Sequence, residues 1–389
     1  MRRGAETIQK GWKKMTMECG KRGGGWRKLG RAGTVALAFA LSGCAAQAVG
    51  HTGESSFVLS SDVKSELQAK KLPLIQGDPV ELPDRVRFEE VLNVREGSML
   101  FNRADGLYKA ELERLDEPRK VSETRASEVS EDGRRSLYER DGRHYVSDLE
   151  SGETWVLDGA EANSRWSFAD PEGEYVIGGV PGIIGLIRPA SGEAKWADLK
   201  KIFDTSKYGY SYGNPRYYGG YIYVDGSFAD KDNAIYRFSP DGGEAELYLD
   251  FPGGKARDSI GDYRFLPGGE LMFNGTYDRE NGLFVYDPQT REVSSLVLGT
   301  RIDGLDVGVS YSLSPDGKKL LFHTRDENND HVYQAELDGT QLANGRYILR
   351  DSLHASVSRL AYWNDDSVSY YLKYTPPGGT VESIVAYKF

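Results

Sequence analysis

Beyond about residue 90, apolar and polar positions alternate along the chain with a period of two, and turn residues interrupt them at regular intervals. The clearest unit has an alternating run at 309–313, a Ser-Pro-Asp-Gly turn at 314–317 and an apolar run at 319–322. A third run at 331–335 and an Asp-Gly turn at 338–339 follow. Period-two alternation indicates half-buried strands, and Pro-Asp-Gly supplies the φ angles that a hairpin needs. The pattern predicts a four-stranded antiparallel unit.

This unit recurs along the chain. Its first hairpin turn returns every 36 to 49 residues, at Gly97, Gly133, Gly173, Gly220, Gly269, Gly317 and Asp366. A period of about 40–50 residues is typical of a four-stranded propeller blade, which cannot bury both of its faces alone. Helical solenoids have similar periods, but their apolar residues do not alternate with period two. We therefore expect an all-β fold, a β-propeller of seven four-stranded blades.

The last repeat lacks one strand. It supplies three apolar runs, at 356–363, 367–374 and 382–389, and the sequence then ends. An unassigned apolar run, Leu72–Gly77, precedes the first full repeat. Pairing it with the last blade would close the ring and cover strand edges that an open array exposes. We expect the propeller to span 72–389, with its last blade closed by this N-terminal strand.

The segment Ser314–Phe322 resembles the repeat of TolB and of other WD40-like propellers, which also occurs in the propellers of dipeptidyl-peptidase-like enzymes. The similarity is strong in this repeat and fair in the one around Gly133. It implies a TolB-like propeller with a binding or scaffolding role. It implies no catalytic residue.

The N-terminal region has the composition of a bacterial export signal. A stretch rich in Lys and Arg precedes a short apolar run at 32–41, and Leu41-Ser42-Gly43-Cys44 follows. That tetrapeptide resembles a lipobox, which implies cleavage between Gly43 and Cys44 and lipidation of Cys44. The run is too short to span a bilayer, which needs roughly 20 apolar residues. We expect a signal peptide at 1–43, a lipidated cysteine and flexible tether at 44–71, and a lipid-anchored protein on the extracytoplasmic side of the cell envelope.

Removal of this signal makes the chain strongly acidic. The full chain has a net charge of −10, and residues 1–43 hold ten of its 49 basic and two of its 59 acidic residues. The remainder has 39 basic and 57 acidic residues, a net charge of −18. Such a surface disfavours nucleic acid as a partner and favours a soluble, monomeric domain. Cys19 lies in the signal, so we expect no disulfide in the mature chain.

Candidate binding residues lie on one predicted face of the ring, where the loops between blades and between second and third strands are long. Long loops on a rigid scaffold commonly carry function. One set is aromatic and offers large contact area at low entropic cost: Tyr208, Tyr210, Tyr212, Tyr217 and Tyr218. Tyrosines of this kind also pack between blades. The other set is acidic and comes from three successive second-to-third strand loops: Asp230, Asp232, Asp278 and Asp326.

No pattern in the sequence indicates a catalytic, metal or cofactor site. The loop beginning at Asp326 has oxygen donors at alternate positions, but His331 and Leu337 occupy the places of the glycine and glutamate of a calcium loop. We therefore expect a non-catalytic propeller that binds a protein, peptide or glycan, without a metal or cofactor. One alternative is an exported polysaccharide lyase or hydrolase that uses clustered carboxylates. A purely structural envelope component is another.

Overall fold

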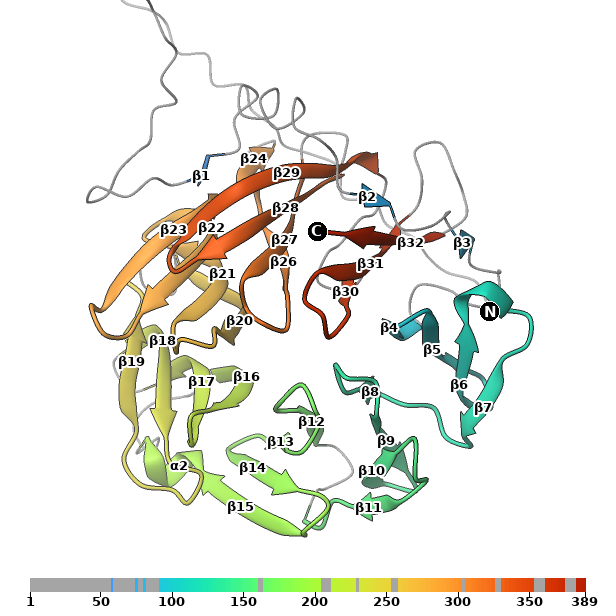
Figure 1. The fold of residues 1–389 in the computed structure, drawn as a ribbon. Coiled ribbons are helices and arrows are strands. Elements are labelled where there is room, and N and C mark those ends of the chain that lie inside the picture. Colours follow the sequence, from blue (N-terminus) through green and yellow to red (C-terminus); the bar gives the residue numbers. More distant parts are fainter. Residues whose placement is uncertain are drawn as a thin grey trace, which may run out of the picture. The chain divides into compact units, whose positions relative to one another are not determined.

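The computed structural model describes the backbone of residues 57–58, 74–75, 80–81, 91–159, 164–203, 211–228, 231–252, 258–302, 305–325, 330–352, 361–374 and 383–389 of the 389-residue chain. These residues form an all-β propeller of seven antiparallel sheets around a common centre (Figure 1). The prediction of a seven-bladed propeller is thus confirmed. Residues 1–56, which include the predicted cleavage and lipidation site at Gly43 and Cys44, lie outside the described residues.

Each blade consists of strands that follow one another in the chain and pair with their sequence neighbours. Blades 1 to 3 contain β4 (Val91–Arg95), β5 (Ser98–Arg103), β6 (Gly106–Glu111) and β7 (Arg119–Ser122); β8 (Glu128–Val129), β9 (Arg135–Arg140), β10 (Arg143–Asp148) and β11 (Thr154–Val156); and β12 (Arg165–Phe168), β13 (Val176–Val180), β14 (Ile183–Arg188) and β15 (Glu193–Asp198).

Blades 4 to 7 repeat the arrangement. They contain β16 (Ser211–Tyr218), β17 (Tyr221–Phe228), β18 (Lys231–Phe238) and β19 (Glu246–Asp250); β20 (Ser259–Phe265), β21 (Leu271–Tyr277), β22 (Glu280–Asp287) and β23 (Glu292–Leu298); β26 (Ser310–Leu313), β27 (Lys319–Arg325), β28 (Asp330–Asp338) and β29 (Gln341–Ser352); and β30 (Ala361–Trp363), β31 (Ser369–Tyr374) and β32 (Ser383–Lys388). The first strand of each blade is the innermost (Figure 1).

Elements outside the blades are short. The described residues include a 3-10 turn, η2 (Leu112–Arg114), one helical turn, α2 (Leu199–Ile202), and the hairpin β24 (Thr300–Ile302) and β25 (Leu305–Val307). No helix among them is long and apolar enough to cross a membrane.

Three short N-terminal strands lie on blade edges. The backbones of β2 (Leu74–Ile75) and β3 (Val80–Glu81) pair with β32, and β1 (Phe57–Val58) pairs in parallel with the outermost strand of blade 5, β23. Residues 72–73 and 76–79 lie outside the described residues. Closure of the last blade by this N-terminal strand therefore stays a prediction.

The first hairpin turns fall where the repeat places them. Glycines with positive φ occupy six of these turns, from Gly97 to Gly317, and Ser367 (φ 51°) takes this conformation in the seventh. Gly317 shows why a side chain is excluded there, because a Cβ would overlap the ring of Pro267 in the preceding blade. This turn thus packs on the neighbouring blade as well as reversing the chain.

Apolar clusters fill the interfaces between neighbouring blades. Within the described residues, each successive pair of blades shares one cluster, from Leu100 and Val129 between blades 1 and 2 to Leu321 and Tyr370 between blades 6 and 7. Blades 7 and 1 share a further cluster, in which Tyr371 packs near Phe101. Packing between the first and last blades therefore closes the ring.

Candidate functional site

Charged residues from blades on opposite sides of the ring meet at its centre. Arg264 on β20 of blade 5 donates to Glu131 in the first turn of blade 2, with Nη1 and Oε1 2.8 Å apart. Blades 3 and 4 lie between these two blades, so the ion pair crosses the central channel. Both side chains stay accessible, with 43% of Arg264 and 56% of Glu131 exposed. Proximity of the Glu131 carboxylate raises the pKa of Arg264.

A second ion pair lies beside the first. Arg216 on β16 donates from Nη2 to Oδ1 of Asp262 on β20, at 2.7 Å, and from Nε to the Tyr263 carbonyl. Asp262 is itself held in place, because its backbone N–H donates to the side-chain oxygen of Asn274 at 2.6 Å. Arg216, Asp262 and Arg264 therefore lie on the adjacent inner strands β16 and β20, and Glu131 reaches Arg264 from the first turn of blade 2.

Two further carboxylates near these arginines are strongly desolvated. Burial raises the pKa of Glu128, on β8, to about 7, although the Phe168 N–H donates to it and Arg216 and Arg264 favour its charged form. Burial likewise raises the pKa of Asp225, on β17, to about 6. The Oδ1 atom of Asp225 is buried and accepts no hydrogen bond from the described residues. Both groups change charge close to neutral pH.

We call these six residues the channel cluster: Glu128, Glu131, Arg216, Asp225, Asp262 and Arg264. The cluster combines exposed ion pairs with carboxylates whose pKa values are raised. Such perturbed groups are more frequent at functional sites than elsewhere. Tyr311 borders the cluster, and its buried hydroxyl has no hydrogen-bond partner among the described residues. Its pKa is raised by burial and by the charge of Asp262.

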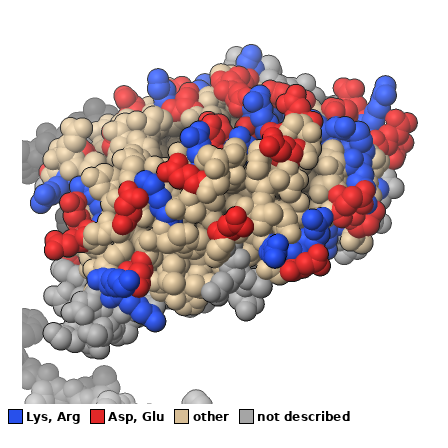
Figure 2. All heavy atoms as spheres, turned by 90° about the horizontal axis from the view of Figure 1, so that it is seen from below, with Lys and Arg blue, Asp and Glu red and all other residues tan. Residues whose placement is uncertain are grey.

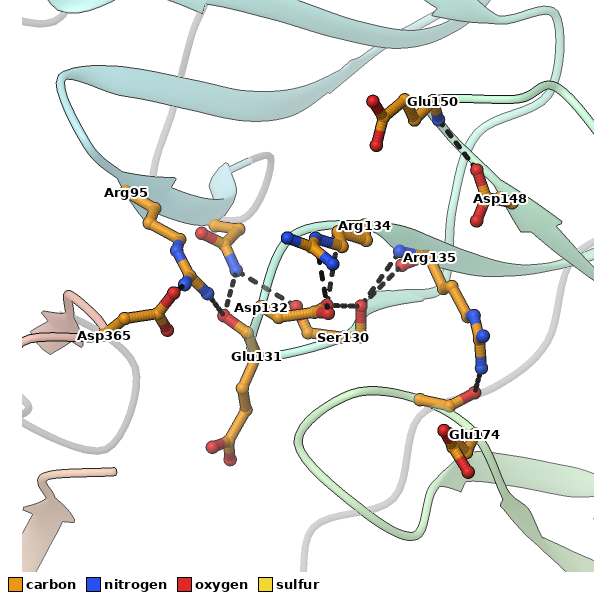
Figure 3. A network of polar contacts seen from close by, with 12 residues as sticks. Arg95, Ser130, Glu131, Asp132, Arg134, Arg135, Asp148, Glu150, Glu174 and Asp365 are labelled. Carbon is orange, nitrogen blue, oxygen red and sulfur yellow. Dashed lines mark hydrogen bonds and ion pairs between the residues drawn. The ribbon is translucent and has the colours of Figure 1, made fainter. Parts of the chain in front are cut away.

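A network of hydrogen bonds fixes the turn that carries Glu131 (Figure 3). The carbonyl of Glu131 accepts from Asn93 at 3.1 Å and from Arg95 at 3.4 Å, both on blade 1. On the other side, Arg135 donates to the Gly173 carbonyl of blade 3 at 2.8 Å. The Glu131 side chain points away from this network in Figure 3 and is free to meet Arg264.

On the outside of the ring the two signs of charge are mixed. In Figure 2, Lys and Arg side chains lie among Asp and Glu side chains, with uncharged surface between them. A mixed surface of this kind does not by itself nominate a binding site.

The two predicted tyrosines with described side chains pack between blades. The Tyr217 ring lies 5.4 Å from that of Tyr175 in blade 3. The Tyr218 ring stacks on Phe265 of blade 5 at 4.4 Å, and its hydroxyl donates to the Leu266 carbonyl at 3.3 Å. Tyr208 and Tyr210 lie outside the described residues. Tyr212 lies on β16, and only its backbone is described.

Two of the four predicted acidic residues, Asp232 and Asp278, lie in or beside turns between second and third strands. Asp278 is exposed at the tip between β21 and β22, with a φ of 47°. Asp232 lies near the start of β18, with only its backbone described. Asp230 and Asp326 lie outside the described residues. Their joint role in binding stays a prediction, as does that of the tyrosines.

The described residues contain no group of three or more His, Cys, Asp or Glu side chains arranged to hold a metal ion. The carboxylates of the channel cluster are instead paired with arginines or buried singly.

Sequence reasoning missed this cluster because Glu131 and Arg264 are 133 residues apart, and neither belongs to a recognisable motif.

Comparisons with known proteins give similarity of fold. No family model matches the chain, and no curated protein matches it. Among solved structures, the β-propeller domain of the trilobed protease from Pyrococcus furiosus is 14% identical, with a TM-score of 0.48, covering 76% of this chain and 94% of that one. The Dos1 propeller is 9% identical, with a TM-score of 0.45, covering 77% and 92%.

The tricorn protease is 10% identical, with a TM-score of 0.40 over 72% of this chain. The match covers 31% of the tricorn chain, so this chain corresponds to a part of that protein. At these identities the similarity concerns the fold and not the activity.

We predict that Glu128 makes stability depend on pH in a definite direction. Its pKa is about 7 in the folded chain against 4.5 for an ordinary glutamate, so the folded state binds the proton more tightly. The contribution of Glu128 to stability is therefore fully present below pH 4.5 and is lost as the pH rises to about 7. Glu128→Gln should gain about 3 kcal/mol relative to the wild type across this window.

Urea unfolding of both proteins between pH 4.5 and 8 measures this difference. Glu117→Gln, at an exposed position in blade 1, is the control and should differ from the wild type by a constant amount. A constant difference for Glu128→Gln as well would contradict the desolvation of Glu128.

Proposed function

We propose that this chain is a membrane-anchored extracytoplasmic lipoprotein whose propeller binds a protein, peptide or glycan partner at the central channel. The observation that carries the binding role is the channel cluster. It places two arginines and four carboxylates where a ligand can form hydrogen bonds and ion pairs with them in place of those that they form with one another.

The exposure of the ion pairs supports this role. An ion pair that is about half exposed contributes roughly 0–1 kcal/mol to stability, so the Arg264–Glu131 pair is not needed to hold the ring together. A ligand with charged or hydroxyl groups can therefore replace either residue of the pair with little loss of folding free energy. Asp225, whose buried Oδ1 atom accepts no hydrogen bond from the described residues, provides a further acceptor close to Arg216.

One strand connects this cluster with the tyrosine-rich segment of the sequence. Strand β16 contains Tyr212 near its start and Arg216 further along, and Tyr208 and Tyr210 precede it directly. A ligand that enters from the tyrosine-rich end of β16 would therefore reach Arg216 within one strand length. This continuity supports a single binding site made of both sets of residues.

The proposed location of the protein at a membrane rests on its N-terminal sequence. The basic stretch, the short apolar run and the Leu-Ser-Gly-Cys sequence resemble a lipoprotein signal. A diacylglycerol on Cys44 together with an N-acyl chain would supply the two or more lipid groups that stable anchoring needs. The resemblance to TolB-like propellers agrees with a binding or scaffolding role.

A second candidate function is hydrolysis or elimination on a polysaccharide. The observation in its favour is the pair of raised carboxyl pKa values, because Glu128 at about 7 can hold a proton to donate at neutral pH. The partner carboxylate would be Asp262 or Glu131, both of which are exposed and paired with arginine.

We predict that the arginines of the channel cluster are required for partner recovery. The lipidated full chain, cross-linked to its neighbours in cell envelopes, should retain its partner far better than the double variant Arg216→Ala/Arg264→Ala, by about tenfold or more. The triple variant with Tyr208, Tyr210 and Tyr212 changed to Ala should lose the partner as well.

The matched control is Arg140→Ala/Arg143→Ala, which removes two arginines from a hairpin of blade 2. It should recover the partner as the wild type does. Equal recovery by the wild type and the channel variant would contradict the site. A captured glycan that the wild type shortens, and Glu128→Gln does not, would favour the enzyme instead.

We predict that Cys44 determines where the protein is held. When cells are grown with a radioactive fatty acid, the wild-type protein should become labelled and should fractionate with membranes. The Cys44→Ala protein should remain unlabelled. A labelled Cys44→Ala protein would contradict the lipobox.

A further inference from the structure

A groove lies between blades 1 and 2, apart from the channel cluster, with a volume of about 370 Å³. One wall is a row of four side chains across blade 1: Asn93, Leu100, Lys109 and Arg119. They share one face of the sheet because each is directly opposite the next in an antiparallel pair. The other wall includes Asp132 and Arg134 in the first turn of blade 2 (Figure 3).

The outer end of this row carries two like charges side by side. Lys109 and Arg119 are direct cross-strand neighbours on β6 and β7. Like charges in this position destabilise a sheet. Blade 4 shows the usual solution, because Arg237 on its third strand lies opposite Glu246 on its fourth, with an ion pair of 2.7 Å. Within the described residues, neither Lys109 nor Arg119 has such a carboxylate within 4.0 Å.

A third cation faces the same groove. The Arg134 side chain is 72% exposed, and its ion pair with Asp132 is long, at 4.0 Å. The Oδ1 atom of Asp132 already accepts the Ser130 hydroxyl at 2.6 Å and the Arg134 backbone N–H at 3.0 Å. Oδ1 of Asp132 therefore holds the turn, and Oδ2 lies 4.0 Å from Nε of the Arg134 guanidinium, whose other nitrogens can bind a ligand.

Apart from Asp132, the acidic residues of the groove form no ion pair with these three cations in the described part of the chain. Asp365 is paired with Arg95 at the inner end. Glu96 and Glu150 also line the groove, and among the described residues neither forms an ion pair with Lys109, Arg119 or Arg134. Lys109 and Arg119, which have no carboxylate within 4.0 Å among the described residues, thus border one cavity together with Arg134, whose ion pair with Asp132 is long. The chain beyond residue 43 has 57 acidic and 39 basic residues.

We propose that this groove binds a phosphate group, held by Lys109, Arg119 and Arg134. A phosphate monoester has about two negative charges and several acceptor oxygens, and arginine guanidinium groups match its geometry with two parallel hydrogen bonds. Its charge would cancel the repulsion between Lys109 and Arg119. The net negative charge of the chain repels anions in general, so the local cations of the groove would have to attract the phosphate. This site is separate from the channel cluster and does not rest on the proposed function.

The test is thermal unfolding of the purified full chain with phosphate or with sodium chloride at equal ionic strength. A ligand that binds the folded state raises the midpoint, and we expect about 3 °C at about 20 mM phosphate. Arg119→Glu places a carboxylate opposite Lys109, so this variant should fold at least as well as the wild type. Its midpoint should show a response to phosphate below about 1 °C.

Arg143→Glu is the matched control, because it makes the same change in the like-charged pair of Arg140 and Arg143, outside the groove. Its response to phosphate should equal that of the wild type. A larger shift with glycerol 3-phosphate than with inorganic phosphate would identify an ester as the ligand, and equal shifts would identify the free group. The site would be disproved by a phosphate effect no larger than that of chloride, or by an unchanged effect in Arg119→Glu.

Discussion

A four-stranded sheet of this size has two apolar faces and can bury neither of them alone, and this constraint organises the whole ring. Each blade buries its faces against its two neighbours, so every interface depends on the next. The cluster of Tyr371 and Phe101 between blades 7 and 1 completes this cycle. The ring therefore brings the seven innermost strands together at a centre where short, polar segments of distant sequence face one another.

The charges at this centre are not explained by stability. Ion pairs as exposed as Arg264–Glu131 add little to the free energy of folding, and burial of Glu128 costs free energy when it is ionised. An apolar or neutral residue would serve a merely structural channel equally well. Our proposal that the channel cluster binds a ligand rests on these accessible ion pairs and on the carboxylates beside them, which are costly to ionise.

The sequence was most informative where structure is local. A turn such as Ser314–Gly317 is specified by its own residues, so the spacing of such turns located all seven blades. Tyr217 and Tyr218 show what a local pattern cannot predict, because aromatic residues occur both in binding sites and in packing between blades. The structure shows their packing against Tyr175 and Phe265, which no pattern in their own segment indicates.

The channel cluster could not be predicted, for a different reason. Glu131 lies in a turn, and Arg264 near the end of a strand, where charged residues are ordinary. The interfaces between blades 2 and 3, 3 and 4, and 4 and 5 separate the two residues along the ring. Only closure of the ring brings Nη1 of Arg264 to 2.8 Å from Oε1 of Glu131. The groove between blades 1 and 2 could not be predicted either. The η2 turn separates Lys109 from Arg119 in the sequence, and only the register of β6 and β7 places them side by side.

The central claim is that the charges in the channel serve a ligand and not the fold. A double-mutant cycle of Arg264→Ala and Glu131→Ala, measured by urea unfolding of the free protein, tests it most directly. The account predicts a coupling free energy below about 1 kcal/mol, as for other exposed ion pairs. A coupling of about 3 kcal/mol or more, typical of a buried pair on which folding depends, would contradict it.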